Sequence, residues 1–391
     1  MDHKIIKEDT TGRVQEMACL TIELFKGIAQ TSEINNTERI SSFLTPYLPH
    51  LSNLMTYFVQ NLSICESLLQ LFRDYTESFI SLLNIQQCSI LFQSCATLLQ
   101  SYSSHHLCQS NRTVVVISTN NKIDSLEEEQ KYSDILCVIQ LLIHITSKDF
   151  IDDDVDNANN NTTQQVTNII FFGLSQILPL MTQGLLQYTN LCSHFFSLVG
   201  FMMDTYPDKA CSLAPNLLTS LFDSMLFGIS HVDPMIAKSS LRGIGEIARE
   251  HFQTGGGPLT QYIQSHNPNL WNVCISRLLK DVILQHNFGS NNDGLRLEAA
   301  SMTFLALMAV VTDISLVVRE IFQQYCINND GNGSINAIKL QRLENAFQKL
   351  VHSVNPEIFT SKGQAGRKLR IVYRKQFETF VKDVHAQMIC N

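Results

Sequence analysis

A few stretches of the 391-residue chain combine residue types that could do chemistry, and the first of them resembles a calcium-binding loop. The run from Asn328 to Ile335 matches the third, fifth, sixth and eighth positions of an EF-hand, although its first position is Asn rather than Asp. Its twelfth position is Lys339, so a positive charge replaces the bidentate glutamate that holds the ion. A tight turn between helices is therefore favoured, and a calcium-regulated helical protein is the alternative.

Two further groups lack the surroundings that their chemistry needs. His105, His106 and Cys108 could begin a metal site, but no second ligand pair stands at zinc spacing. Gly243 and Gly245 lie inside a helical pattern with no strand before them, so close helix packing is favoured over a dinucleotide site. No nucleophile motif or distinctive carboxylate pair occurs. We therefore predict a protein that is not an enzyme and uses no metal or cofactor.

The segment from 150 to 163 is rich in Asp and Asn, which predicts an exposed acidic loop. Such a loop could contact a basic partner. The alternative is a solvated insertion that binds no partner, and runs of charged residues generally favour that interpretation. The candidate partner-binding residues are Asp149, Asp152, Asp153, Asp154 and Asp156.

The elements that would position these residues are helices. Between Gln164 and Phe252, apolar residues recur at the spacing of one helix face in three successive patterns. Pro207 ends the first pattern, and Asp233 followed by Pro234 predicts the N-terminal cap of the third. A further amphipathic helix is predicted from Val14 to Ala29. Its apolar set consists of Val14, Met17, Ala18, Leu20, Ile22, Leu24, Phe25 and Ile28.

Each of these helices is too apolar on one side to stand alone, so neighbouring helices must cover it. The segments pair into antiparallel hairpins of roughly 40 to 47 residues, a length typical of HEAT repeats. We therefore predict an all-α, HEAT-like helical-repeat solenoid that runs continuously over 1–391. Loops are expected at about 103–124 and 150–163, and a C-terminal capping helix at 365–391.

Composition limits the possible settings and partners. The formal net charge of -8 disfavours direct nucleic-acid binding, which needs clustered Lys and Arg, and suits a partner with a basic patch. The eleven cysteines form no CxxC pair, and most stand at apolar helical positions, as in proteins of a reducing compartment. The longest apolar run, 302–311, is shorter than the ~20 residues that span a bilayer, so we predict no membrane insertion.

Several stretches together resemble one family of transport proteins. They are Glu127 to Tyr132 with Ser147 to Asp152, Ile177 to Met181, Tyr206 to Lys209, Asn345 to Leu350, and Phe377 to Cys390. The chain is similar, from about Ala18 onward, to the exportin branch of the karyopherin-β nuclear transport receptors. The likeness lies in spread helical positions and not in one diagnostic motif.

The resemblance implies a HEAT-repeat superhelix that carries protein cargo through nuclear pores under the control of Ran. Its expected partners are Ran in the GTP form, a protein cargo such as a basic or hypusine-bearing translation factor, and nuclear pore proteins. Its expected location is the nucleus and the cytoplasm. The likeness covers only about the last third of such a receptor and omits the N-terminal arch that makes most of the Ran contact. A fragment, a truncated gene model and a short isoform all stay open, and the rival function is a HEAT-repeat scaffold that never engages Ran.

Overall fold

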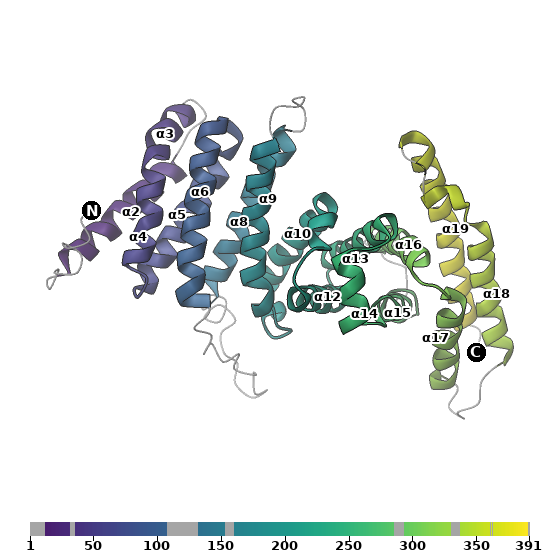
Figure 1. The fold of residues 1–391 in the computed structure, drawn as a ribbon. Helices are drawn as coiled ribbons and strands as arrows, with labels where there is room; N and C mark the ends of the chain where they lie inside the picture. The colour runs from purple at the N-terminus through teal and green to yellow at the C-terminus, as the bar shows by residue number, and fades with distance from the viewer. Residues whose placement is uncertain are drawn as a thin grey trace, which may run out of the picture. The chain divides into compact units, whose positions relative to one another are not determined.

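The computed structural model describes residues 12–31, 36–107, 132–152, 160–284, 293–329, 337–359, 361 and 363–389. These ranges contain helices and no strand, so the prediction of an all-α helical-repeat solenoid is confirmed (Figure 1). The superhelical path expected from the resemblance stays a prediction. Within the same ranges, no helix is long and apolar enough to cross a membrane. The chain divides into two compact units, Met1–Leu198 and Val199–Asn391, and the division falls inside one helix, α10.

The first unit consists of two layers of helices. Its helices are α2 (Arg13–Gln30), α3 (Thr37–Leu44), α4 (Leu48–Tyr57), α5 (Leu62–Phe79), α6 (Ile85–Tyr102), α8 (Ser133–Asp152), α9 (Asn160–Ile177) and the first part of α10 (Thr189–Thr205). In one layer α2 packs on α5 and α5 on α8, and in the other α4 packs on α6 and α6 on α9 (Figure 1). The pairs α4–α5, α5–α6 and α8–α9 join the layers, so the apolar core lies between them.

Local sequence explains where these helices begin and break. Asn84 and Gln87 form a capping box at the start of α6, in which each side chain accepts a hydrogen bond from the other residue's backbone N–H. Pro46 and Pro49 interrupt the helical stretch at 37–57, because proline cannot donate the helical hydrogen bond. The structure accordingly has α3, a 3₁₀ turn at Thr45–Tyr47 and then α4.

Aromatic side chains fill the core of the first unit. Tyr75 is fully buried, and its ring lies 4.9 Å from that of Phe79. The Tyr75 hydroxyl is satisfied by Thr45, whose Oγ1 lies 2.7 Å away. Burial raises the pKa of Tyr75 to about 12, so the phenol stays protonated at neutral pH. This hydrogen bond joins the 3₁₀ turn before α4 to α5 and gives the buried hydroxyl a partner.

The second unit repeats the layered plan. Its elements are the end of α10, α11 (Pro207–Ala210), α12 (Pro215–Ile229), α13 (Pro234–Thr254), α14 (Pro258–His266), α15 (Leu270–Arg277) continued by a π-helical segment (Leu278–Leu284), α16 (Asp293–Val310), α17 (Ile314–Asn329), α18 (Ala337–Ser353) and α19 (Gly363–Ile389). One layer runs α13–α16–α19. α12 packs on α13, α15 on α16 and α17, and α18 on both α17 and α19.

The predicted breaks in this unit are confirmed. α10 ends at Thr205, immediately before Tyr206 and Pro207. Asp233 caps α13, because its Oδ1 accepts a hydrogen bond of 2.8 Å from the Met235 N–H, and Pro234 occupies the first helical position.

A glycine lets α13 and α16 approach each other closely. A Cβ atom on Gly245 would lie 3.1 Å from both the Cα and the Oγ1 of Thr303. Thr303 Oγ1 in turn donates a hydrogen bond of 2.6 Å to the carbonyl oxygen of Leu241 across the same interface. Gly243 faces Met225 and Met203 in the same way. The prediction that these two glycines serve close helix packing is confirmed.

Polar contacts between successive repeats show the repeat length directly. Side-chain hydrogen bonds join residues 44 apart in Lys26–Gln70 and in Lys280–Gln324, 45 apart in Thr56–Ser101, and 43 apart in Thr219–Tyr262. Because each contact joins helices of successive helical pairs, the separation measures one helical pair. The predicted unit of 40 to 47 residues agrees with this spacing in both halves of the chain.

The structure differs from the prediction at some loop boundaries and on α2. Ser103–Leu107 continues α6 as a π-helical segment, and helix also covers Phe150 to Asp152 and Asn160 to Thr163, so the predicted loops are wrong at these positions. The rest of both predicted loops, 108–124 and 153–159, lies outside the described residues. The helix at α2 is confirmed, but only part of its apolar set is buried. Ala18 and Ile22 face the core, whereas Met17, Leu20 and Leu24 are 61%, 64% and 62% exposed.

We predict that Gly245→Val lowers the free energy of unfolding by about 1–3 kcal/mol, since the added side chain meets the α16 backbone. The matched control is Gly27→Val in α2, where no atom lies within 4 Å of the added Cβ, and it should stay within about 0.5 kcal/mol of the parent. Urea denaturation followed by circular dichroism measures both. Equal effects at the two glycines would contradict close α13–α16 packing.

Candidate functional site

Charged residues in the first unit are confined largely to one layer of helices. None of the residues of α4, α6 and α9 is Asp, Glu, Lys or Arg. The other layer, α2, α5 and α8, carries charged side chains in every helix. The helices that face one another across the core thus present chemically different outer surfaces.

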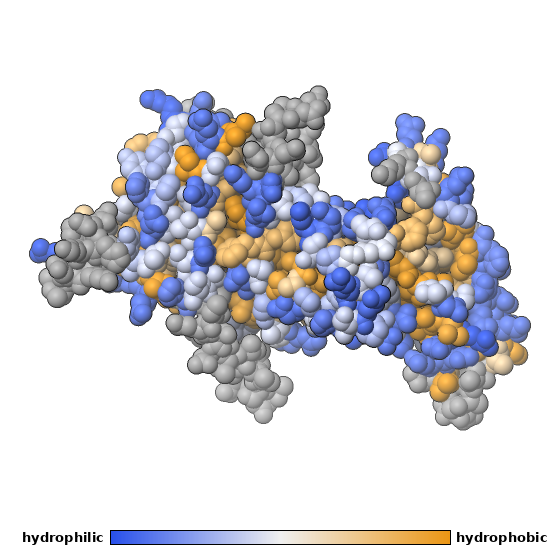
Figure 2. Space-filling model, in the orientation of Figure 1, coloured by the Kyte–Doolittle hydropathy of each residue, from blue (hydrophilic) through white to orange (hydrophobic). Residues whose placement is uncertain are grey.

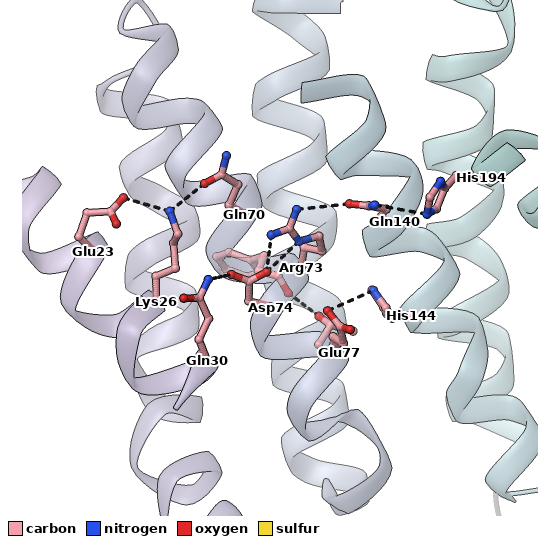
Figure 3. A network of polar contacts seen from close by, with 12 residues as sticks. Glu23, Lys26, Gln30, Gln70, Arg73, Asp74, Glu77, Gln140, His144 and His194 are labelled. Carbon is pink, nitrogen blue, oxygen red and sulfur yellow. Dashed lines mark hydrogen bonds and ion pairs between the residues drawn. The ribbon is translucent and has the colours of Figure 1, made fainter. Parts of the chain in front are cut away.

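We call the connected polar side chains on α2, α5, α8 and the start of α10 the polar ladder (Figure 3). Its members are Glu23, Lys26, Gln30, Gln70, Arg73, Asp74, Glu77, Gln140, His144 and His194.

The ladder begins with two parallel contacts between α2 and α5. Lys26 Nζ donates to Gln70 Oε1 at 2.8 Å and pairs with Glu23 Oε1 at 3.2 Å. One turn further along, Gln30 Nε2 donates to Asp74 Oδ2 at 2.7 Å. The two contacts have the same sequence separation, since both join equivalent turns of adjacent repeats.

Asp74 is the most buried member of the ladder, with an exposed fraction of 6%. Its Oδ1 accepts hydrogen bonds from Arg73, at 2.8 Å from Nε and 2.6 Å from Nη2, while its Oδ2 is held by Gln30. A carboxylate that is removed from water needs such donors on both oxygens. Arg73 and Gln30 supply them from two different helices.

Arg73 then starts a chain of donors that runs toward α10. Its Nη1 donates to Gln140 Oε1 at 3.3 Å, and Gln140 Nε2 lies 3.4 Å from His194 Nε2. His194 Nδ1 lies 2.9 Å from the carbonyl oxygen of Asn190, which can only accept. Nδ1 therefore carries the proton of the neutral ring and Nε2 accepts from Gln140. One direction of donation thus connects α5, α8 and α10 (Figure 3).

His144 adds a titratable group beside this chain. Its Nε2 lies 3.7 Å from Glu77 Oε2, and Glu77 itself is 61% exposed. Burial lowers the pKa of His144 below its usual value, while the neighbouring Glu77 acts in the opposite direction and Arg73 lowers it further. The ring is therefore neutral in the folded protein at physiological pH.

The second unit carries a comparable set of ion pairs on α13 and the end of α10. Arg242 Nη2 lies 2.7 Å from Asp204 Oδ2, and Arg249 pairs with Glu246 one turn below. Burial raises the pKa of Asp204, which Arg242 opposes, and burial likewise raises the pKa of Glu246, which Arg249 opposes. Each carboxylate thus has an arginine partner on the same surface.

A third group joins α16 to α19. Arg374 Nη1 lies 2.9 Å from Glu298 Oε1, and its Nε lies 3.2 Å from Glu378 Oε1. The layer α13–α16–α19 thus resembles α2–α5–α8 in carrying ion pairs between and along its helices. Such surfaces suit recognition of a large partner, because many weak polar contacts can be satisfied together.

The acidic residues that the sequence singled out cannot be placed. Asp153, Asp154 and Asp156 lie outside the described residues, and so do the side chains of Asp149 and Asp152, which belong to the end of α8. Their suggested role in partner binding therefore stays a prediction.

The candidate metal stretches gain no support as sites. In the EF-hand-like run, 330–336 and the side chains of Asn328 and Asn329 lie outside the described residues. Lys339, at the twelfth position, is buried with its Nζ 5.8 Å from the centre of the Tyr325 ring. His105 is exposed and contacts the Ser101 carbonyl oxygen, while Cys108 is not described. In the part of the chain that the structure describes, no three His, Cys, Asp or Glu side chains gather as a metal site would require.

The cysteines behave as core residues. Nine are described, all as free thiols, and eight of these are buried. Burial raises the pKa of Cys65 to about 11 and that of Cys274 to about 12, so their thiols stay protonated. The sequence interpretation of small core side chains is confirmed for these positions.

The polar ladder was not predicted, although the sequence holds a signal for it. Its residues are ordinary surface types taken singly, and their contacts cross 44 to 67 positions. The signal is the alternation of helices that lack charge with helices that carry it. Once the repeat length is known, that alternation assigns the charges to one layer.

No protein-family model matches the chain. Evidence for a function therefore comes from the layered fold and the polar ladder. Both belong to a protein that offers polar side chains from several helices to one surface. That arrangement can bind a macromolecule over a wide area.

We predict that Asp74→Ala destabilises the first unit by about 1–3 kcal/mol, because it leaves Gln30 and the half-buried Arg73 without their acceptor. The control, Glu77→Ala, removes an exposed carboxylate three residues away and should change stability by less than about 1 kcal/mol. Urea denaturation measures the difference. Similar losses of stability in both variants would show that the buried Asp74 contributes no more to stability than the exposed Glu77.

We expect the pKa of His144, measured by NMR titration of its ring, to lie below 6.5 and to fall further in Glu77→Gln. The unfolded chain binds more protons at His144 between pH 6.5 and the lowered folded pKa. The free energy of unfolding should therefore decrease as the pH falls through that window. His144→Gln should reduce this decrease. An unchanged titration in Glu77→Gln would rule out the interaction across 3.7 Å.

Proposed function

We propose that the chain belongs to a nuclear export receptor of the karyopherin-β kind, similar to exportin-4, and binds protein cargo together with Ran in its GTP form. The observation that supports it best is the polar ladder, which offers side chains from four helices on the charged layer of the first unit. A helical-repeat protein with one charged layer and one uncharged layer has a defined side for binding a folded partner. The sequence resemblance supplies the transport role.

The charge of the chain favours a basic cargo. The net charge is -8, and the exposed carboxylates Glu23 and Glu77 belong to the ladder. A cargo with a positively charged patch, such as a hypusine-bearing translation factor, would meet these groups with favourable long-range attraction. Nuclear pore proteins are the further partners proposed, and the nucleus and the cytoplasm the proposed locations. Neither catalysis, a cofactor nor direct contact with nucleic acid forms part of this proposal.

The alternative is a HEAT-repeat scaffold that holds a protein complex together without Ran. The same ladder would serve it, since wide polar surfaces bind permanent partners as well as transient ones. Only the dependence on the nucleotide state of Ran distinguishes the two functions.

The test is a pull-down from nuclear extract with the immobilised chain, with Ran-GTP or Ran-GDP added in parallel. Ran and a cargo retained only with the GTP form are the expected result. Partners retained equally with both forms would favour the scaffold. Retention of neither Ran nor any other protein would contradict the proposal that this chain is sufficient for binding.

A matched pair of variants locates the surface. Glu77→Lys reverses an exposed charge on α5 within the ladder, and Glu38→Lys does the same on α3, which contributes nothing to the ladder. We expect Glu77→Lys to weaken retention of the cargo by about threefold to tenfold, the effect of losing one exposed charge pair and gaining a repulsion. Glu38→Lys should have no effect. If Glu38→Lys weakened retention of the cargo and Glu77→Lys did not, the binding surface would lie outside the polar ladder.

A further inference from the structure

The outer face of α19 carries a regular row of lysines. Lys368, Lys375 and Lys382 are exposed and stand seven residues apart, so they lie on one side of the helix at intervals of about 10.5 Å. The opposite side is the buried one. It holds Tyr373, Phe377, Phe380, Val381 and Val384. The lysine row therefore points away from the core along about 21 Å of helix.

Apolar and small side chains fill the spaces in this row. Ile371 and Val372 lie between the first two lysines and are 52% and 53% exposed. Thr379 and Ala386 are exposed at the corresponding places further along. Figure 2 shows apolar surface over the C-terminal helices with hydrophilic residues beside it. We call the set Lys368, Ile371, Val372, Lys375, Thr379, Lys382 and Ala386 the lysine seam.

The lysine seam lacks neutralising carboxylates. α19 contains six Lys or Arg residues but only two acidic ones, Glu378 and Asp383, in a chain whose net charge is -8. Glu378 is paired with Arg374, which also binds Glu298. Among the described residues, no carboxylate forms an ion pair with the three lysines of the seam. Its positive charge is therefore available to a partner.

A requirement that the end of the helical stack stays soluble does not explain the row of lysines or the exposed Ile371 and Val372. A face that only has to stay in water carries mixed charges and few exposed branched apolar residues. The lysine seam instead combines one sign of charge with two adjacent β-branched side chains. Lysines stand at every seventh residue of the seam, and apolar or small residues follow each of them three or four positions later. This spacing is typical of a helix that packs against another helix.

We propose that the lysine seam of α19 is a docking surface for an acidic amphipathic helix of a partner protein. Carboxylates at every seventh position of that helix would pair with the three lysines, and its apolar side chains would cover Ile371 and Val372. Thr379 and Ala386 are small enough to let the two helices come close. A second copy of this chain does not fit, because two lysine rows would repel each other. A nucleic acid would supply negative charge but would leave the two apolar side chains in water.

The test uses the full chain and a fluorescent synthetic helix, measured by anisotropy without Ran or extract. The peptide has three heptads. Each heptad carries Glu at the same position and Leu three residues after that Glu. We expect saturable binding that weakens with salt. Lys368→Glu/Lys375→Glu/Lys382→Glu should lower the affinity at least about tenfold, and Ile371→Ser/Val372→Ser about threefold or more. A peptide with Lys in place of Glu should bind the triple variant and not the parent.

Two controls match the variants by position and exposure. Lys349→Glu and Ile338→Ser change exposed residues of α18 and should leave the affinity within about twofold. Because the substituted lysines are exposed, the triple variant should keep the parent's circular dichroism and melting temperature. Equal binding by parent and triple variant would overturn the proposal. Tighter binding of a single-stranded RNA oligonucleotide than of the peptide would also overturn it. Neither result depends on the proposed transport function, since Ran is absent.

Discussion

Burial of apolar helix faces against the equivalent helix of the next repeat is the interaction on which the rest of the structure depends. No helix here could bury its own apolar side, so each is stable only when a neighbour about 44 residues away covers it. Where α13 packs closely on α16, Gly245 lacks the side chain that would keep the two backbones apart. Packing therefore decides the repeat length and favours glycine at the close α13–α16 contact.

Packing in layers also separates the charges by side. α4, α6 and α9 carry no charged residue, while α2, α5 and α8 hold the polar ladder. Since every repeat contributes the equivalent turn to the same surface, side chains far apart in the chain become hydrogen-bond partners. The proposed receptor function rests on this repetition of one helix face, whereas the lysine seam rests on the spacing within α19 alone.

Helices and their ends were predictable because their causes are local. Asp233 before Pro234 predicted a cap that the structure shows, and Pro207 predicted a break. Gly243 and Gly245 were correctly assigned to helix packing. The apolar set of α2 was assigned to a helix correctly, but its burial was not. Leu20 and Ile22 stand two residues apart, which places them about 200° apart around the helix axis. A single neighbour such as α5 can cover only one of the two, and in the structure Ile22 is the buried one.

The sequence by itself thus determined an all-α repeat protein, its pairing into units of roughly 40 to 47 residues and the placement of most cysteines at apolar helical positions, because periodicity and composition act within one or two helices. Only the tertiary structure decided which charges meet. Asp74 is held by Gln30 across 44 positions, and Gln140 links Arg73 to His194 over still longer separations. No local pattern contains such contacts, since they exist only when the repeats stack in register and bring equivalent turns side by side.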